Sequence, residues 1–94
     1  MLQVLRGMTW NPEGFCDPTK HLFVRESIRE HRLDFIALLE TSRSNFVVPF
    51  LQHLACGFDF TWYCLPPHGR LGGILVGINM ETLHVKKVDV GISL

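Results

Sequence analysis

The sequence lacks an excess of charge of either sign and any cysteine pattern of a known framework. Nine Lys and Arg residues balance nine Asp and Glu residues, so no overall basic field exists to hold nucleic acid by counterion release. Any contact with nucleic acid must be local. The three cysteines, Cys16, Cys56 and Cys64, are odd in number and widely spaced. This spacing argues against a disulfide framework and a zinc site, so we expect reduced thiols.

Long apolar runs are also absent. The segment MLQVLRGMTW contains Arg6 and has no apolar run long enough for a signal peptide. No later stretch approaches the roughly 20 apolar residues that span a bilayer. We therefore expect an intracellular protein with no membrane partner, and the sequence leaves open whether it is nuclear or cytoplasmic and whether it is oligomeric.

The composition that remains is that of one small globular domain. Of the 94 residues, 47% are hydrophobic and 19% are charged, which is far from the signature of a disordered chain. A chain of this length buries roughly 60–65% of its unfolded surface, so its stability is marginal.

The first half of the chain predicts a strand, a helix and a second strand. Even positions from 2 to 10 are apolar except Arg6, which indicates a strand that ends at Asn11. Asp17 followed by Pro18 is typical of a helix start, and we expect a helix over about 18–32. The apolar segment LDFIALLETS fits a strand covered on both faces, although a continued helix has the same pattern.

The second half predicts one more helix and three strands. SNFVVPFLQHLACG has helical spacing and ends at Gly57, with Pro49 tolerable only in the first turn. FDFTWYCL alternates as an amphipathic strand, and PPHGR ends it. LGGILVGIN and LHVKKVDV then predict two strands joined as a hairpin around residues 80–82. The expected fold class is α/β at the start of the chain and β-rich at its end.

Two polar residues follow the first two predicted strands. Asn11 comes after MTW and Glu40 after FIALL. Two parallel strands joined by a crossover helix bring these ends together, at the edge where ligands usually bind. One carboxylate and one amide suit a hydrated magnesium ion. Taken singly, Asn11 before a proline is a turn initiator and Glu40 is a solvent-facing strand end.

The segment TWNPEGFCDPTKHLFVRESIREHRLDFIALLET resembles the start of the endonuclease/exonuclease/phosphatase superfamily. Members of this family begin with a strand ending in W-N-x-x-G and have a second strand ending in Gln-Glu-Thr. The chain is most similar to the endonuclease domain of plant non-LTR (LINE-type) retrotransposons, and GRLGGILVGIN matches their Gly-Gly strand. The resemblance covers residues 4–78.

The resemblance implies a DNase I-like fold, of which this chain would hold the first strands and helices of a four-layer α/β sandwich. It implies that Glu40 ligates magnesium and that Asn11 helps to position the scissile phosphate. The implied reaction is metal-dependent hydrolysis of a phosphodiester, with DNA as the partner and no small-molecule cofactor.

The chain also departs from the family pattern. Glu13, Leu33 and Leu39 stand where the family usually has a basic residue, Pro and Gln. The family's catalytic His-Asp pair and Asp-x-Asn motif lie downstream of the matched region. Residues 1–94 are therefore expected to be a truncated N-terminal portion of the domain, inactive as an isolated fragment, with an uncovered apolar sheet face and uncovered strand edges.

No other residue replaces the missing groups convincingly. A lone histidine is usually a surface or satisfied residue, and His68 with Arg70 is the only pair positioned to approach a substrate, an interpretation that we do not favour. Tyr63 fits a half-exposed strand aromatic, and Gly72-Gly73 suggests a bulge or a close backbone approach. Two further hypotheses stay open beside the inactive nuclease remnant. One is an active phosphoesterase with a rearranged site, and the other is a non-catalytic α/β interaction module.

Overall fold

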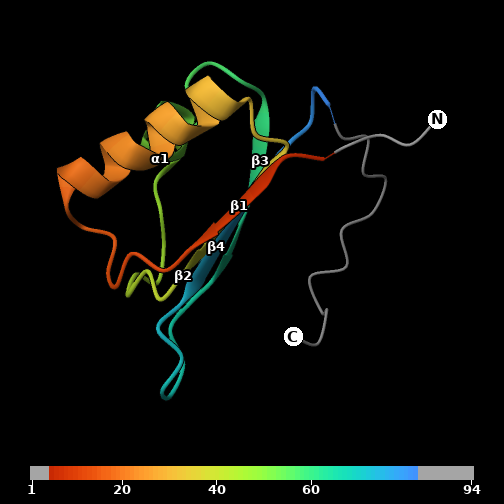
Figure 1. Cartoon of the computed structure of the whole chain (residues 1–94). Coiled ribbons are helices and arrows are strands. Elements are labelled where there is room, and N and C mark those ends of the chain that lie inside the picture. Colours follow the sequence, from red (N-terminus) through yellow and green to blue (C-terminus); the bar gives the residue numbers. More distant parts are fainter. Residues whose placement is uncertain (1–4, 83–94) are drawn as a thin grey trace.

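The computed structural model describes residues 5–82, which form a mixed four-stranded sheet and two helices (Figure 1). The strands lie in the order β1-β2-β4-β3. Their bounds are β1 Gly7–Trp10, β2 Phe35–Leu39, β3 Phe60–Leu65 and β4 Ile74–Asn79, and the helices are α1 Pro18–His31 and α2 Val48–Ala55. The expected α/β class is confirmed, whereas the DNase I-like type of that class stays a prediction.

Helix α1 begins as the sequence predicts. The Asp17 side chain accepts a hydrogen bond from the Thr19 N–H at 2.8 Å, and Pro18 occupies the first helical position, where no N–H is needed. The helix ends at His31, and its C-cap Arg32 has a left-handed φ of 48°. Val24 and Ile28, one turn apart, are fully buried against the sheet. This helix joins β1 to β2.

The connection through α1 makes β1 and β2 parallel neighbours. Gly7 pairs with Phe35 and Trp10 pairs with Leu38. The carboxyl ends of both strands therefore lie at the same edge of the sheet. Asn11 and Glu40 can meet only in such an arrangement, because each follows the carboxyl end of its strand.

The structure contains a hairpin that the sequence did not predict, between β3 and β4. Strand β3 pairs with β4 in antiparallel register, from Phe60 with Asn79 to Leu65 with Ile74, and residues 66–73 connect them. Strand β4 also pairs with β2, so both of its sides are occupied. The predicted partner strand over 83–90 lies outside the described residues.

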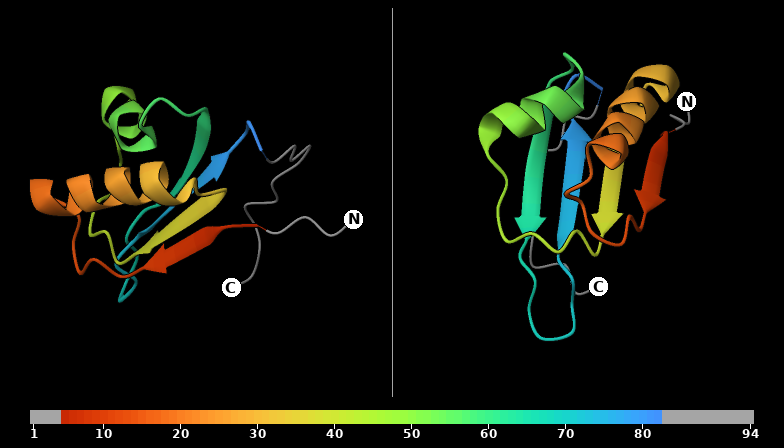
Figure 2. Two further views of the ribbon diagram at one scale, coloured as in Figure 1. Left: turned by 45° about the horizontal axis from the view of Figure 1, so that its top comes forward. Right: turned by 90° about the vertical axis from the view of Figure 1, so that its left-hand side faces the viewer.

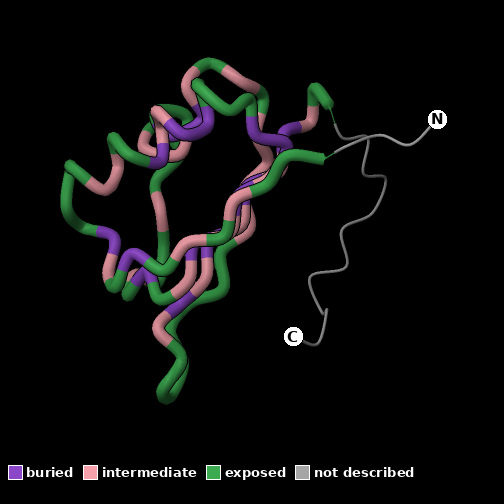
Figure 3. The backbone as a smooth tube through the Cα atoms, viewed as in Figure 1, coloured by how far each residue is buried: buried purple, intermediate pink, exposed green. Residues whose placement is uncertain are grey.

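Both helices cover the same face of the sheet (Figure 2). The core lies between these layers, and Figure 3 shows buried backbone on the inner side of α1 and along the central strands. Ile36 and Leu38 of β2 and Leu75 of β4 are fully buried there. The remaining members of this core are Phe15, Val24, Ile28, Leu33 and Leu54.

The opposite face of the sheet has no covering layer among residues 5–82. Burial along β2 and β4 alternates residue by residue, so only every second side chain is buried. The prediction that β2 is covered on both faces is therefore wrong for the described part of the chain. The open face carries apolar side chains in register, including Phe35 opposite Ile78 and Ala37 opposite Val76. This observation agrees with the expected uncovered apolar face.

Helix α2 is shorter than its apolar spacing predicts. It begins at Val48 because Pro49 must lie in the first turn, and its N-cap Val47 offers no side-chain hydrogen bond. Phe46 lies before the helix and stacks on Phe50 with ring centroids 6.0 Å apart. Neither described helix has the length and apolar character needed to cross a membrane.

Candidate functional site

The structure brings Asn11 and Glu40 into contact at the carboxyl edge of β1 and β2. Asn11 Nδ2 donates a hydrogen bond to Glu40 Oε2 at 3.2 Å, across 29 residues of sequence. Both residues are exposed. The pair is thus open to solvent, as a site for a substrate phosphate or a hydrated ion must be.

Asn11 is at the same time a turn residue. Its side-chain oxygen Oδ1 accepts a hydrogen bond from the Glu13 N–H at 3.0 Å, which closes an Asx turn through Pro12. The two readings of Asn11 are therefore compatible. The turn fixes the amide plane, and that plane presents Nδ2 to Glu40.

The backbone that follows β2 is held from both sides. From one side, the Gly14 N–H donates to the Glu40 carbonyl at 2.8 Å and the Phe15 N–H donates to the Thr41 carbonyl at 2.9 Å. From the other side, the Thr41 N–H donates to the Gly73 carbonyl at 3.2 Å. The carboxylate of Glu40 is therefore mounted on a backbone with little freedom to move.

Several residues of this edge have left-handed backbone conformations that are unusual for their type. Glu13, Glu40 and Ser42 have φ values of 52°, 53° and 58°. Each such residue costs of the order of 1 kcal/mol or more and persists only where its surroundings enforce it. Such strain is common at functional sites, and here it lies next to the Asn11–Glu40 pair.

Gly72 allows the close approach that holds Glu40. A Cβ at this position would lie 3.0 Å from Glu40 Cα and 3.1 Å from Glu40 Cβ, which is tighter than ordinary van der Waals contact. The sequence suggested a bulge or a close backbone approach at Gly72-Gly73, and the close approach is confirmed. Both glycines precede β4, which begins at Ile74.

Three cationic or ionisable side chains hold the loop that follows Asn11. Lys20 Nζ donates to the Pro12 carbonyl at 2.6 Å, His21 Nε2 lies 2.9 Å from the Phe15 carbonyl, and Arg43 donates to that carbonyl at 3.4 Å. Arg43 also lies over the ring of Phe46 at 4.5 Å. Lys20 and Arg43 therefore place positive charge behind the loop that carries the site.

Thr41 is a further polar group at this edge. The residue is fully buried, and its Oγ1 has no hydrogen-bond partner in the described structure. A Cβ on Gly73 would lie 3.0 Å from that oxygen. Unsatisfied buried hydroxyls are uncommon in proteins. The residues directly after β2 thus contain both a strained backbone at Glu40 and an unpaired hydroxyl at Thr41.

The site offers magnesium one carboxylate ligand, that of Glu40, without a larger cluster of ligand side chains in the described part of the chain. Glu40 offers one carboxylate, and one of its oxygens is already oriented by Asn11. Within residues 5–82, no group of three or more His, Cys, Asp and Glu side chains converges on one point. An ion held here would have Glu40 as its carboxylate ligand and would keep most of its water shell, which magnesium tolerates.

No hydrogen bond described for residues 5–82 joins the other sequence candidates to this pair. His68 and Arg70 are exposed in the β3–β4 connection, where His68 forms an isolated bridge with Leu71. Tyr63 lies in β3 at an intermediate exposure, as expected for a half-exposed strand aromatic. Lys20, Arg43 and Gly72 were missed as site residues. Their contacts are set by the fold, since Arg43 and Phe15 are 28 residues apart in sequence.

One carboxylate at the opposite end of the sheet has a shifted pKa. The Thr82 hydroxyl and the backbone N–H of Arg6, which lies 2.8 Å from Asp34 Oδ2, hold the pKa of Asp34 below its ordinary value. Asp34 is buried, and its carbonyl accepts a hydrogen bond from the Asn79 N–H at 2.8 Å. Asp34 thus joins the N-terminal segment to β4, far from Glu40 along β2.

Comparisons of the chain with protein-family models, with curated proteins and with solved structures found no match.

Proposed function

We propose that this chain is the N-terminal portion of a magnesium-dependent phosphodiesterase domain of the retrotransposon DNA endonuclease type. In this proposal Glu40 is the magnesium ligand and Asn11 orients its carboxylate and contacts the scissile phosphate. The proposal rests on the resemblance of the segment from Thr9 to Thr41, which contains both W-N-x-x-G and Glu-Thr.

The observation that supports it most strongly is the contact between Asn11 and Glu40. The two residues come from separate strand ends and meet at 3.2 Å. The left-handed backbone of Glu40 supports it further, since strained conformations gather at functional sites. The open apolar face of the sheet is also what a domain with a second layer would leave in this part of its chain.

A bound magnesium ion would polarise a phosphoryl oxygen and lower the pKa of a bound water. The residues of this chain would supply the other requirements. Glu40 would hold the ion at the sheet edge, and the Asx turn at Asn11 would keep the amide directed at that edge. Lys20 would add positive charge behind the loop that faces the phosphate. A general base has no candidate among these residues, so hydrolysis by them alone should be negligible.

The experiment is a nicking assay with supercoiled plasmid and magnesium, using the chain and its Glu40→Gln variant. The proposal expects no nicking by the isolated chain, because one metal ligand without a base lowers the barrier little. It also expects magnesium binding that Glu40→Gln abolishes. Nicking that depends on Glu40 would contradict the expected inactivity and would favour the active phosphoesterase with a rearranged site.

The alternative function is a non-catalytic α/β interaction module. It is favoured by the apolar residues on the open face of the sheet, such as Phe35 and Ile78, which lie opposite each other. It predicts a cooperative thermal melt and a defined monomer or dimer without metal. Magnesium binding at Glu40 separates the two functions, since the interaction module gives no reason for it.

A further inference from the structure

Strand β3 lies at an edge of the sheet, and one of its sides has no strand partner within residues 5–82. It is last in the order β1-β2-β4-β3 and pairs only with β4. Figure 2 shows β3 at the margin of the sheet, beneath α2. An edge strand presents a row of backbone N–H and carbonyl groups that can pair with another strand.

The hydrogen-bonding phase of β3 can be derived from its neighbours. The Met80 N–H donates to the Asp59 carbonyl at 2.7 Å, and Asp59 and Met80 continue the register in which Phe60 faces Asn79. In an antiparallel ladder, hydrogen-bonded pairs alternate with pairs that are not hydrogen-bonded. Residues 61, 63 and 65 therefore bond to β4, and the backbone groups of residues 60, 62 and 64 point to the open side.

The groups on that open side are available for pairing. The Phe60 N–H already donates to the Phe58 carbonyl at 3.1 Å. The N–H groups of Trp62 and Cys64 have no such backbone acceptor among the described residues. Cys64 is exposed and Trp62 is half-buried. Two donors and three carbonyls thus form a free row along β3.

The sequence of β3 carries none of the features that usually protect an edge. FTWYCL has no charged residue and no proline, and it is rich in residues that favour strands. Natural edge strands are commonly blocked by lysine, proline or a bulge. The proline nearest to β3 is Pro66, which follows the last residue of the strand.

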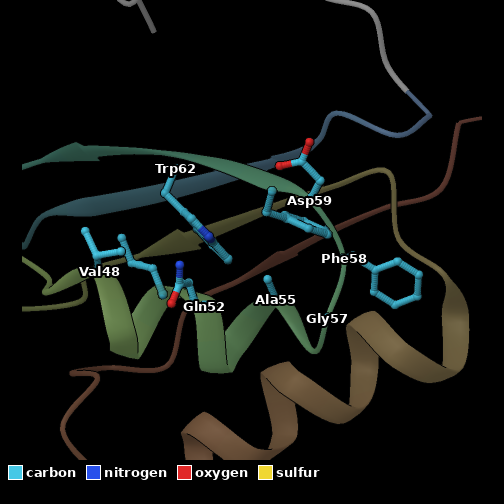
Figure 4. A pocket seen from close by; sticks show the side chains of 9 residues that line it. Val48, Gln52, Ala55, Gly57, Phe58, Asp59 and Trp62 are labelled. Atoms are coloured by element: carbon cyan, nitrogen blue, oxygen red, sulfur yellow. The ribbon is translucent and has the colours of Figure 1, made fainter.

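A groove with a mostly apolar lining, to which Gln52 and Asp59 also contribute, runs beside the same edge. It has a volume of about 500 Å³ and lies between α2 and β3, with Val48, Leu51, Phe58, Phe60 and Trp62 among its lining residues. Figure 4 shows Trp62 and Val48 on facing sides of this groove. Val48 is 63% exposed, so a strand added to β3 would find apolar surface next to the backbone groups that it pairs with.

The distribution of charge along β3 favours a second copy of the chain as the partner. The start of β3 is acidic, because Asp59 lies there and its N–H donates to the Glu81 carboxylate at 3.3 Å. The connection that follows β3 contains the cation Arg70 and no acidic residue. A second β3 in antiparallel orientation would bring the acidic end of each copy towards the basic end of the other. The uncharged middle of the strand would then face itself without repulsion.

We propose that β3 pairs with β3 of a second copy of this chain, antiparallel and about a two-fold axis at Trp62. The sheets of the two copies then join into one. Trp62 donates to and accepts from Trp62 of the second copy, and the Cys64 N–H of each donates to the Phe60 carbonyl of the other. The indole of each copy stays packed over Gly77 of its own β4, so the backbone groups carry the pairing between the copies. A closed two-fold interface of this kind gives a dimer and no longer assembly.

The test compares Cys64→Pro with Cys64→Ser by sedimentation of the full chain over a wide concentration range. Proline removes the outward N–H of this exposed position without removing a hydrogen bond to β4, whereas serine keeps that N–H. Thermal melts of both variants check that the fold is retained. We expect the wild type and Cys64→Ser to dimerise and Cys64→Pro to bind its copy roughly tenfold or more weakly, since a symmetric dimer loses this bond twice. A monomer at all concentrations, or a dimer that Cys64→Pro leaves unchanged, would overturn the proposal.

Hydrogen exchange of single amides gives a readout that needs no variant. Exchange at Trp62 and Cys64 should slow as the concentration rises, while the amides of Thr61 and Tyr63, which bond to β4, should be protected throughout. Protection of Trp62 and Cys64 that does not depend on concentration would mean that another part of the same chain covers the edge. That result would also overturn the proposal.

Discussion

The amide of Asn11 donates a hydrogen bond to the carboxylate of Glu40, and the two residues lie 29 positions apart in the chain. This contact exists because a crossover helix makes β1 and β2 parallel neighbours, so that their carboxyl ends share one edge. The same amide closes an Asx turn through its oxygen. One side chain therefore shapes the loop and orients the carboxylate.

Asn11→Ala should weaken both the turn after β1 and the orientation of the Glu40 carboxylate. The variant loses the hydrogen bonds to Glu13 and Glu40, so we expect it to lose about 0.5–1.5 kcal/mol of unfolding free energy. Because the Glu40 carboxylate is no longer oriented, magnesium should bind several-fold more weakly. Chemical denaturation and metal titration measure the two losses. Unchanged metal affinity in a folded variant would show that Asn11 acts only in the turn.

Gly72→Ala should disturb Glu40 from its other side. The added methyl group would lie 3.0 Å from Glu40 Cα and 3.2 Å from Glu40 Cγ, and crowding of this kind costs about 1–3 kcal/mol. We expect lower stability together with weaker magnesium binding. The control is Gly69→Ala in the β3–β4 connection, where nothing lies within 4 Å of the added Cβ. That control should lose some stability, because the Gly69 φ is 59°, but should keep its metal affinity.

Asp17→Ala tests the helix that joins β1 to β2. The Asp17 carboxylate caps α1 through the Thr19 N–H at 2.8 Å, and removing such a cap costs about 0.5–2 kcal/mol. Asp17→Asn should retain most of this stability, because asparagine caps about as well as aspartate. Thermal melts followed by circular dichroism measure both variants. Equal losses for Ala and Asn would assign the effect to the charge of Asp17 near the helix start.

Asp34 should make stability fall at acid pH. Its pKa is below the ordinary value in the folded chain because of the Thr82 hydroxyl and the Arg6 N–H. A lowered folded pKa means that the stabilisation is fully present above the unfolded pKa of about 4 and is lost as the pH falls through the folded pKa. Asp34→Asn should remove this part of the pH dependence and be less stable at neutral pH. Denaturation curves at several pH values test it, and an unchanged acid slope in Asp34→Asn would contradict it.

Local patterns predicted the elements better than their arrangement. Asp17-Pro18 marked the start of α1 correctly because capping is decided within one turn. Pro49 likewise limited the start of α2. The insertion of β4 between β2 and β3 had no signal in the sequence, because the alternation of apolar residues reports which face a strand buries and not which strand lies beside it.

The sequence predicted the two central residues of the site but not the residues that surround them. Asn11 and Glu40 follow their strands directly, so a parallel pairing was enough to bring them together. The residues that hold the site in place have no recognisable pattern in the local sequence. The contact of Arg43 with the Phe15 carbonyl and that of Gly72 with Glu40 join segments that are far apart in the sequence. Periodicity also suggested two covered faces for β2, whereas the described structure covers one.

The most direct test of the proposed site is magnesium binding measured with matched carboxylate variants. Manganese, which broadens NMR signals of nearby residues, can serve as the probe in place of magnesium, with magnesium as the competitor. The account predicts that signals of Asn11 and Glu40 broaden, that magnesium reverses this, and that Glu40→Gln abolishes it. Glu13→Gln, which removes an exposed carboxylate two residues after Asn11, should leave binding nearly unchanged. Equal losses in the two variants, or no broadening in the wild type, would contradict the assignment of Glu40 as the metal ligand.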